Sequence, residues 1–223
     1  MKIIIKKSTL DFLKKLKKNN NREWFSKNKE LYDDARYDFE VFVFNLIQKI
    51  SEFDECISGL EPKDCLFRIY RDVRFSKNKA PYKLNFAAAI QIGGRKSSKS
   101  GYYVHIQPGG QSMLACGVYM PMPDVLSSIR KLIASEYKEY ERLIKAKEFK
   151  KEFKEVWGGD DKLKNVPKGF LKDHPAAEHL KNKSFIAYRM VPDEKVLSKN
   201  FPAYSAGICR FMKPFNDFIN RAI

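Results

Sequence analysis

The apolar residues of this 223-residue chain change their spacing part-way along it, and this change constrains the fold most. From Trp24 to Phe53 they recur every three or four residues, as on one face of an amphipathic helix. From Phe67 to Met120 most of them alternate with polar residues, as in strands with one buried face. Helical and strand regions that are separated along the chain in this way are typical of the α+β class.

Four short strands are expected in the second region, over residues 67–75, 82–92, 102–107 and 114–120, and a fifth over residues 185–191. Short polar segments, most of them rich in glycine or containing proline, connect the first four, so neighbouring strands are expected to run antiparallel. The sequence therefore predicts an antiparallel sheet of about five strands with one buried face.

Helices are expected on both sides of the strand region. No repeat, low-complexity tract or linker interrupts the chain, so we expect a single α+β domain over residues 1–223, with several long helices packed against the sheet. Ser8, Asn21 and Asp124 are candidate helix caps. Helices are expected over residues 8–18, from Trp24 to Phe53, from Asp124 towards Trp157, over a short stretch after Pro175, and over residues 200–219. The apolar stripe from Trp24 to Phe53 fits either a straight or a kinked helix.

Several classes of protein are disfavoured. No stretch approaches the ~20 consecutive apolar residues of a membrane span, and the opening residues are too short an apolar run for a signal peptide. The four cysteines include no C-x-x-C pair, and Cys116 and Cys209 have the spacing of buried apolar residues. His174 and His179 are five residues apart, a poor spacing for a helical metal pair. We expect a soluble, cytoplasmic protein without a membrane partner, metal ion or cofactor.

Half of the formal net charge of +16 lies in one short basic segment. Between Arg68 and Lys99 there are nine basic residues and one acid, Asp72. Scattered lysines usually form only a solvated surface, but three of the eleven arginines of this chain fall within seven residues here. Such a concentration of positive charge attracts phosphate and carboxylate groups.

A regular strand over residues 68–75 would point Arg68, Tyr70, Asp72 and Arg74 to one face of the sheet. Arg71 breaks this alternation, so it needs an acid partner, a bulge or a bound anion. The face suits phosphate or carboxylate, because arginine forks bind such groups at two points and tyrosines stack on bases. The same face is expected to include residues of the next two strands, namely Lys83, Asn85, Tyr103 and His105.

Two loops of the basic segment carry further lysines. Lys77 lies in the hairpin loop after the first expected strand, where it is placed to touch a phosphate or simply to favour solubility. The loop from Gly94 to Gly101 lacks the order and the following helix of a phosphate-binding P-loop, so we expect an ordinary hairpin loop there. The candidate ligand-binding residues are therefore Arg68, Tyr70, Arg71, Arg74, Lys77, Lys83 and Tyr103.

Several blocks of the sequence resemble one known family. The most specific is R-x-x-R-D-x-R-F-S-K within residues 68–83, and the others are Phe12–Leu16 with Asn19–Phe25, Asn28 with Lys29, Gly101–Tyr103, and Pro167–Phe170 with His174 and Pro175. In this order they resemble the conserved hypothetical proteins called domain of unknown function 2461 (DUF2461). The resemblance covers nearly the whole chain and implies a single α+β domain, and it brings no catalytic roles with it.

Three functions remain open from the sequence. The first is a phosphate- or anion-binding domain whose partner is nucleic acid or a phosphorylated small molecule. The second is an enzyme of unknown reaction that acts on an anionic substrate at the same site, with Asp72 or His105 as the proton-transfer group. The third is a structural or interaction protein in which Asp72 pairs with a neighbouring arginine and Arg71 bonds to backbone carbonyls. The oligomeric state is left open.

Overall fold

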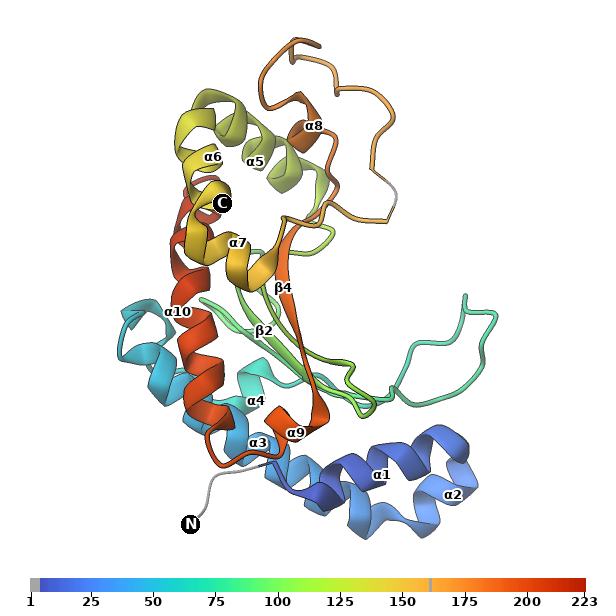
Figure 1. Cartoon of the computed structure of the whole chain (residues 1–223). Helices are drawn as coiled ribbons and strands as arrows, with labels where there is room; N and C mark the ends of the chain where they lie inside the picture. The colour runs from blue at the N-terminus through green and yellow to red at the C-terminus, as the bar shows by residue number, and fades with distance from the viewer. Residues whose placement is uncertain (1–4, 161) are drawn as a thin grey trace.

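The computed structural model describes residues 5–160 and 162–223. In these residues an antiparallel sheet packs against helices (Figure 1), so the predicted α+β class is confirmed. The strand order follows the chain: β1 Phe86–Ile90, β2 Gly101–Ile106, β3 Ser112–Val118 and β4 Phe185–Val191. The helices are α1 Lys7–Lys18, α2 Arg22–Lys27, α3 Lys29–Ser51, the 3-10 helix η1 Glu55–Ile57, α4 Pro62–Cys65, α5 Pro123–Ser135, α6 Tyr137–Lys145, α7 Lys147–Phe153, α8 Ala177–Leu180, α9 Asp193–Val196 and α10 Phe201–Asn220.

The predicted helices are present, but the two longest are interrupted. The stripe from Trp24 is divided at Asn28 into α2 and α3, and the predicted helix from Asp124 is divided into α5, α6 and α7. Apolar spacing continues through these breaks because it reports which face is buried and not where the backbone bends. By contrast, α1 and α10 occupy the predicted ranges, and α10 continues through Pro214.

Only one of the three predicted caps is confirmed. The side chain of Asn21 accepts a hydrogen bond from the backbone N–H of Trp24 at 2.9 Å, which caps α2. The caps at Ser8 and Asp124 are wrong, since α1 and α5 begin without a side-chain cap from either residue. At the start of α1, the carboxylate of Asp38 on α3, which is distant in the sequence, accepts a hydrogen bond from the backbone N–H of Lys6.

One face of the sheet is buried against α3 and α10. Residues of this face alternate along β2 and β3, and they include Tyr102, Val104, Leu114 and Cys116. The hydroxyl of Tyr102 donates to the buried carboxylate of Asp54 at 2.7 Å, so the polar end of this ring is satisfied within the core. The buried apolar side chains form one contiguous cluster that includes these helices and strands.

The predicted first strand is wrong. Residues 67–85, which we call the arm, leave the sheet as an irregular hairpin that projects from the body of the molecule (teal in Figure 1). The two limbs share only scattered backbone contacts, such as the N–H of Arg71 with the carbonyl of Pro81 at 2.8 Å. Proline donates no hydrogen bond, which weakens any ladder, and Phe75, expected on the buried face, is 96% exposed. The sheet therefore has four strands, one fewer than expected.

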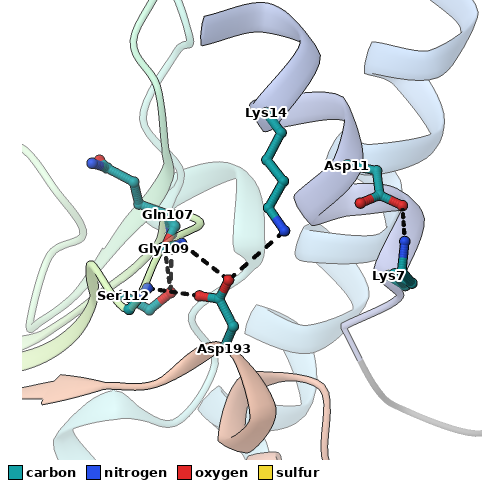
Figure 2. Close-up of polar contacts among 8 residues, drawn as sticks. Lys7, Asp11, Lys14, Gln107, Gly109, Ser112 and Asp193 are labelled. Carbon is teal, nitrogen blue, oxygen red and sulfur yellow. Dashed lines mark hydrogen bonds and ion pairs between the residues drawn. The ribbon is translucent and has the colours of Figure 1, made fainter.

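The turn between β2 and β3 is attached to the start of α9. Gly109 and Gly110 both have positive φ, and their N–H groups donate to the two carboxylate oxygens of Asp193 at 3.0 and 2.9 Å (Figure 2). The ammonium of Lys14 on α1 lies 4.0 Å from the same carboxylate. These contacts hold one end of the sheet in place relative to α1 and α9.

The structure tests two expectations that were drawn from composition: which cysteines are buried, and whether a helix could cross a membrane. Cys65, Cys116 and Cys209 are buried thiols and Cys56 is exposed, so the predicted burial of Cys116 and Cys209 is confirmed. Among the described helices, none is both long enough and apolar enough to cross a membrane.

Candidate functional site

The face of the sheet that is turned away from α3 and α10 forms the floor of a large groove. Its volume is about 930 Å³, near the upper end of the roughly 300–1,000 Å³ of typical ligand pockets. Ala87, Ala89 and Ala115 lie in its floor. Since an alanine projects only a methyl group, these three positions leave the space above the strands open.

The strand register places one aromatic ring between two of these alanines. Tyr103 on β2 pairs with Ala89 on one side and with Ala115 on the other, and Ala115 pairs in turn with Tyr188 on β4. Directly opposed residues of antiparallel strands have Cβ atoms only about 5 Å apart. A larger side chain at either alanine would therefore cover the ring of Tyr103.

Aromatic side chains line the groove at both ends. At the end near the arm, the ring of Phe67 makes an edge contact with Tyr103 at a centroid distance of 6.3 Å. At the opposite end, Tyr119 stacks on Trp157 with 6.1 Å between the ring centroids and an interplanar angle of 5°. Flat aromatic surfaces of this kind bind planar groups, including nucleobases, by stacking.

All the charged side chains among the described groove-lining residues are basic, namely Lys83, Arg95, Lys96 and Lys99. The side chains of Arg95 and Lys99 donate to main-chain oxygens, whereas the ammonium groups of Lys83 and Lys96 make no hydrogen bond or ion pair within the described ranges. The ammonium of Lys83 lies 5.2 Å from the centroid of the Phe67 ring, and burial together with the nearby Arg68 lowers its pKa. Cations without a carboxylate partner make the groove attractive to anions.

Tyr103 and His105 are hydrogen bonded to each other in the floor of the groove. The Nε2 atom of His105 lies 2.6 Å from the carbonyl oxygen of Gln111, and because a carbonyl oxygen only accepts, Nε2 carries the proton. The Nδ1 atom therefore accepts from the hydroxyl of Tyr103 at 3.3 Å. Burial lowers the pKa of His105 and raises the pKa of Tyr103 to about 12, so both groups are neutral near pH 7.

The structure brings only part of the predicted site together. Lys83 and Tyr103 line the groove, as do Asn85 and His105. The other predicted ligand-binding residues do not line it, and all of them lie on the arm: Arg68, Tyr70, Arg71, Arg74 and Lys77. Asp72, the other proton-transfer candidate, is also on the arm.

The side chains of Arg71, Asp72 and Arg74 make contacts within the arm itself. The guanidinium of Arg71 donates to the carbonyl of Ala80 at 2.9 Å and to the hydroxyl of Ser76 at 3.3 Å. Arg74 forms a two-point ion pair with Asp72, with a shortest distance of 2.7 Å, and these hydrogen bonds lower the pKa of Asp72. These contacts are the ones that the structural alternative expects, and they engage the three side chains within the arm.

Several lining residues were missed by the sequence reasoning. Lys96 belongs to the loop that we expected to be an ordinary hairpin, although its basic composition was a usable signal. The alanines of β1 were visible as a run of small residues at positions 87–89. Tyr188 and Trp157 had no local signal, because the pairing of β4 with β3 brings Tyr188 to the groove and a backbone bridge to Ile186 on β4 brings Trp157 there.

Comparison with known proteins establishes the family. Residues 8–218 match the family described as conserved hypothetical protein (DUF2461), which is nearly the whole chain. The chain belongs to the DUF2461 family. Comparison with curated proteins and with solved structures gives no match. No group of three or more His, Cys, Asp or Glu side chains within residues 5–160 and 162–223 is placed to hold a metal ion.

Two of the blocks that carry the DUF2461 resemblance meet at the base of the arm. The side chain of Asn20 accepts from the N–H of Tyr82 at 3.1 Å and donates to its carbonyl at 3.0 Å. The ring of Phe25 on α2 stacks on Tyr82 at a centroid distance of 4.0 Å, and Tyr70 packs against Tyr82 at 5.4 Å. Asn20 and Phe25 therefore hold the base of the arm where it leaves the sheet, next to Phe67 and Lys83 of the groove.

Proposed function

We propose that the groove of this DUF2461 protein binds a ligand that combines phosphate with planar aromatic rings, as nucleotides and nucleic acids do. The observation that carries the proposal is the coincidence of an aromatic lining with charged lining residues that are all basic. Lysine and arginine attract phosphate, and tyrosine and tryptophan stack on bases. The internal pairs of Arg71 and Arg74 account for part of the basic segment, and they do not account for the cations of the groove.

The positions of the two unpaired lysines indicate the size of the ligand. Lys83 precedes β1 and Lys96 follows it, in the loop that leads to β2. The five residues of β1 span about 17 Å, since a strand rises about 3.3 Å per residue. A ligand that reaches both lysines therefore extends along the strand and passes over the ring of Tyr103.

Replacing both unpaired lysines, Lys83→Gln and Lys96→Gln, is expected to weaken binding of a labelled single-stranded hexanucleotide. Each phosphate contact on a single strand adds about 0.7 to the slope of log K against log salt, so losing two contacts should lower the slope by about 1.4. Fluorescence anisotropy over a salt series measures both quantities. Lys138→Gln, at an exposed position of α6 outside the groove, is the matched control and should behave as wild type. An unchanged affinity and slope in the double variant would contradict the proposal.

A second candidate function is an enzyme that acts on an anionic substrate in the same groove. The hydrogen bond between Tyr103 and His105 favours it, because a neutral imidazole in a fixed orientation can accept the proton of the phenol. Asp72 has no part in this candidate, since it pairs with Arg74 on the arm. Mass spectrometry of a nucleotide or oligonucleotide recovered after incubation tests it: chemical change that is lost in His105→Gln supports an enzyme, and an unchanged ligand contradicts one.

A further inference from the structure

The arm continues the chemistry of the groove away from the sheet. Its residues, 67–85, include six basic side chains and one acid. Phe67 and Lys83 at its base line the groove, and the tip of the arm projects away from that end of the sheet (Figure 1). A ligand that leaves the groove past Phe67 and Lys83 therefore meets the arm next.

The arm is braced internally by one group of side chains. The guanidinium of Arg71 bonds across the hairpin to the carbonyl of Ala80. The ammonium of Lys79 donates to the carbonyl of Val73 at 3.1 Å. Asn20 holds Tyr82 at the base, and the N–H of Phe67 donates to the carbonyl of Ala87 on β1 at 2.9 Å. Beyond this base, the two limbs are braced by contacts within the hairpin.

A second group of side chains is left on the outside. Arg68 and Lys77 are exposed and make no hydrogen bond or ion pair with other described residues. The ring of Phe75 is 96% exposed and contacts the guanidinium of Arg74 at 5.8 Å from the ring centroid. Burying a phenylalanine contributes about 1.5–3 kcal/mol, and this ring contributes none of that to the fold. Two cations and one ring are therefore available to a partner.

We infer that the ligand of the groove is a single-stranded polynucleotide that continues from the groove along the arm. The inference rests on the proposed function. Arg68 would contact a phosphate just beyond Lys83 and Lys77 one further along the strand, and the ring of Phe75 would stack on a base near the tip. Single strands suit this arrangement because their bases are free to stack on aromatic side chains, whereas those of a duplex are enclosed.

The length of the arm is consistent with several nucleotides. One limb, residues 67–75, has nine residues and reaches at most about 30 Å. Phosphates along one strand of a duplex are about 3.4 Å apart along the axis, and an extended single strand spaces them more widely. A mononucleotide bound over Tyr103 would not reach Lys77 or Phe75. The arm can therefore raise the binding affinity only of longer ligands.

The test compares deoxythymidine monophosphate with single-stranded deoxythymidylate of three and of twelve nucleotides, and with a twelve-base-pair duplex. The dodecanucleotide should bind at least about 10-fold more tightly than the trinucleotide, because the arm stacks on one further base and contacts two further phosphates. Phe75→Ala combined with Lys77→Gln should weaken the dodecanucleotide by about 10-fold and leave the trinucleotide unchanged. Both side chains are exposed, so the melting temperature of this variant should equal that of wild type. Lys138→Gln again serves as the control.

The outcomes separate this inference from the proposed function. If the trinucleotide binds but the dodecanucleotide binds no more tightly, or if the arm variant binds the dodecanucleotide as wild type does, the inference fails and the groove proposal stands. Tighter binding of the duplex than of the single strand also overturns the inference. If none of these ligands binds at low salt, both proposals fail.

Discussion

Ala89→Trp will lower the affinity of the groove for single-stranded nucleic acid by more than about 100-fold while the protein stays folded. Ala89 lies in the floor of the groove, directly opposite Tyr103. An indole there would fill the open space and cover the ring of Tyr103. Base stacking on aromatic side chains is worth about 1–3 kcal/mol per base, so blocking two stacked bases accounts for a loss of this size.

The substitution leaves the core untouched, because the side chain of Ala89 points away from α3 and α10. Met190→Trp is the matched control, since Met190 lies on the same face of the sheet, is 46% exposed and does not line the groove. Fluorescence anisotropy measures binding, and thermal melting followed by circular dichroism verifies folding. If Ala89→Trp binds the strand as tightly as wild type, the ligand does not occupy the sheet face.

Gly117→Ala will destabilise the protein by at least about 3 kcal/mol. Gly117 on β3 has a φ of +108°, and a Cβ atom there would lie 1.9 Å from the backbone carbonyl oxygen of Phe185 on β4. A backbone of this kind costs an L residue on the order of 1–3 kcal/mol, and β3 and β4 must also separate to relieve the overlap. The N–H of Gly117 donates to Asn216 of α10 at 3.1 Å, so the strand cannot shift without losing this bond.

Chemical denaturation of Gly117→Ala, with Gly207→Ala as the control variant, measures this loss of stability. For a chain of this size, 3 kcal/mol corresponds to a fall in melting temperature of roughly 6–12 °C. Gly207→Ala provides the opposite case, because Gly207 is inside α10 and an added Cβ meets nothing within 4 Å. That change should stabilise the protein by about 0.5–1 kcal/mol, since glycine is a poor helix former. Equal stability of Gly117→Ala and wild type would show that the two strands separate at little cost.

The helices and the last strand were predictable because each has one buried face. Their apolar residues report that face directly, so α1, α10 and β4 lie where the periodicity placed them. The breaks at Asn28 and between α5, α6 and α7 were not predictable, because the same face remains buried on both sides of each break.

The two limbs of the arm were predicted as strand, residues 67–75 as the first strand and residues 82–85 as the start of the second, for a related reason. Alternation from Phe67 to Phe75 fits any extended backbone, and a strand forms only where a neighbour supplies a hydrogen-bond ladder. Arg71, which interrupts the alternation, was a local sign of irregular structure. The structure places its guanidinium against the carbonyl of Ala80, within the hairpin itself.

For the groove, the sequence indicated four of the residues that meet there, namely Lys83, Asn85, Tyr103 and His105. Tyr103 and His105 share a face because of the alternation along β2, whereas Lys83 and Asn85 reach the groove from the base of the arm. The expectation that Arg68 and Arg74 would share it depended on the wrong strand, and these side chains lie on the arm instead. The aromatic residues at the far end of the groove could not be foreseen, because Tyr119 and Trp157 are 38 residues apart in the chain.

The sequence by itself determined the α+β class, the buried faces of most helices and strands, and the position of the positive charge. Local spacing and composition carry that information, because burial alternates with the period of the backbone. Only the tertiary structure decided that the arm leaves the sheet and that Tyr103 and Tyr188 flank Ala115 in one row of the groove. The physical reason is that strand pairing brings together segments that are distant in the sequence. No local pattern specifies the register, which decides which residues lie opposite one another.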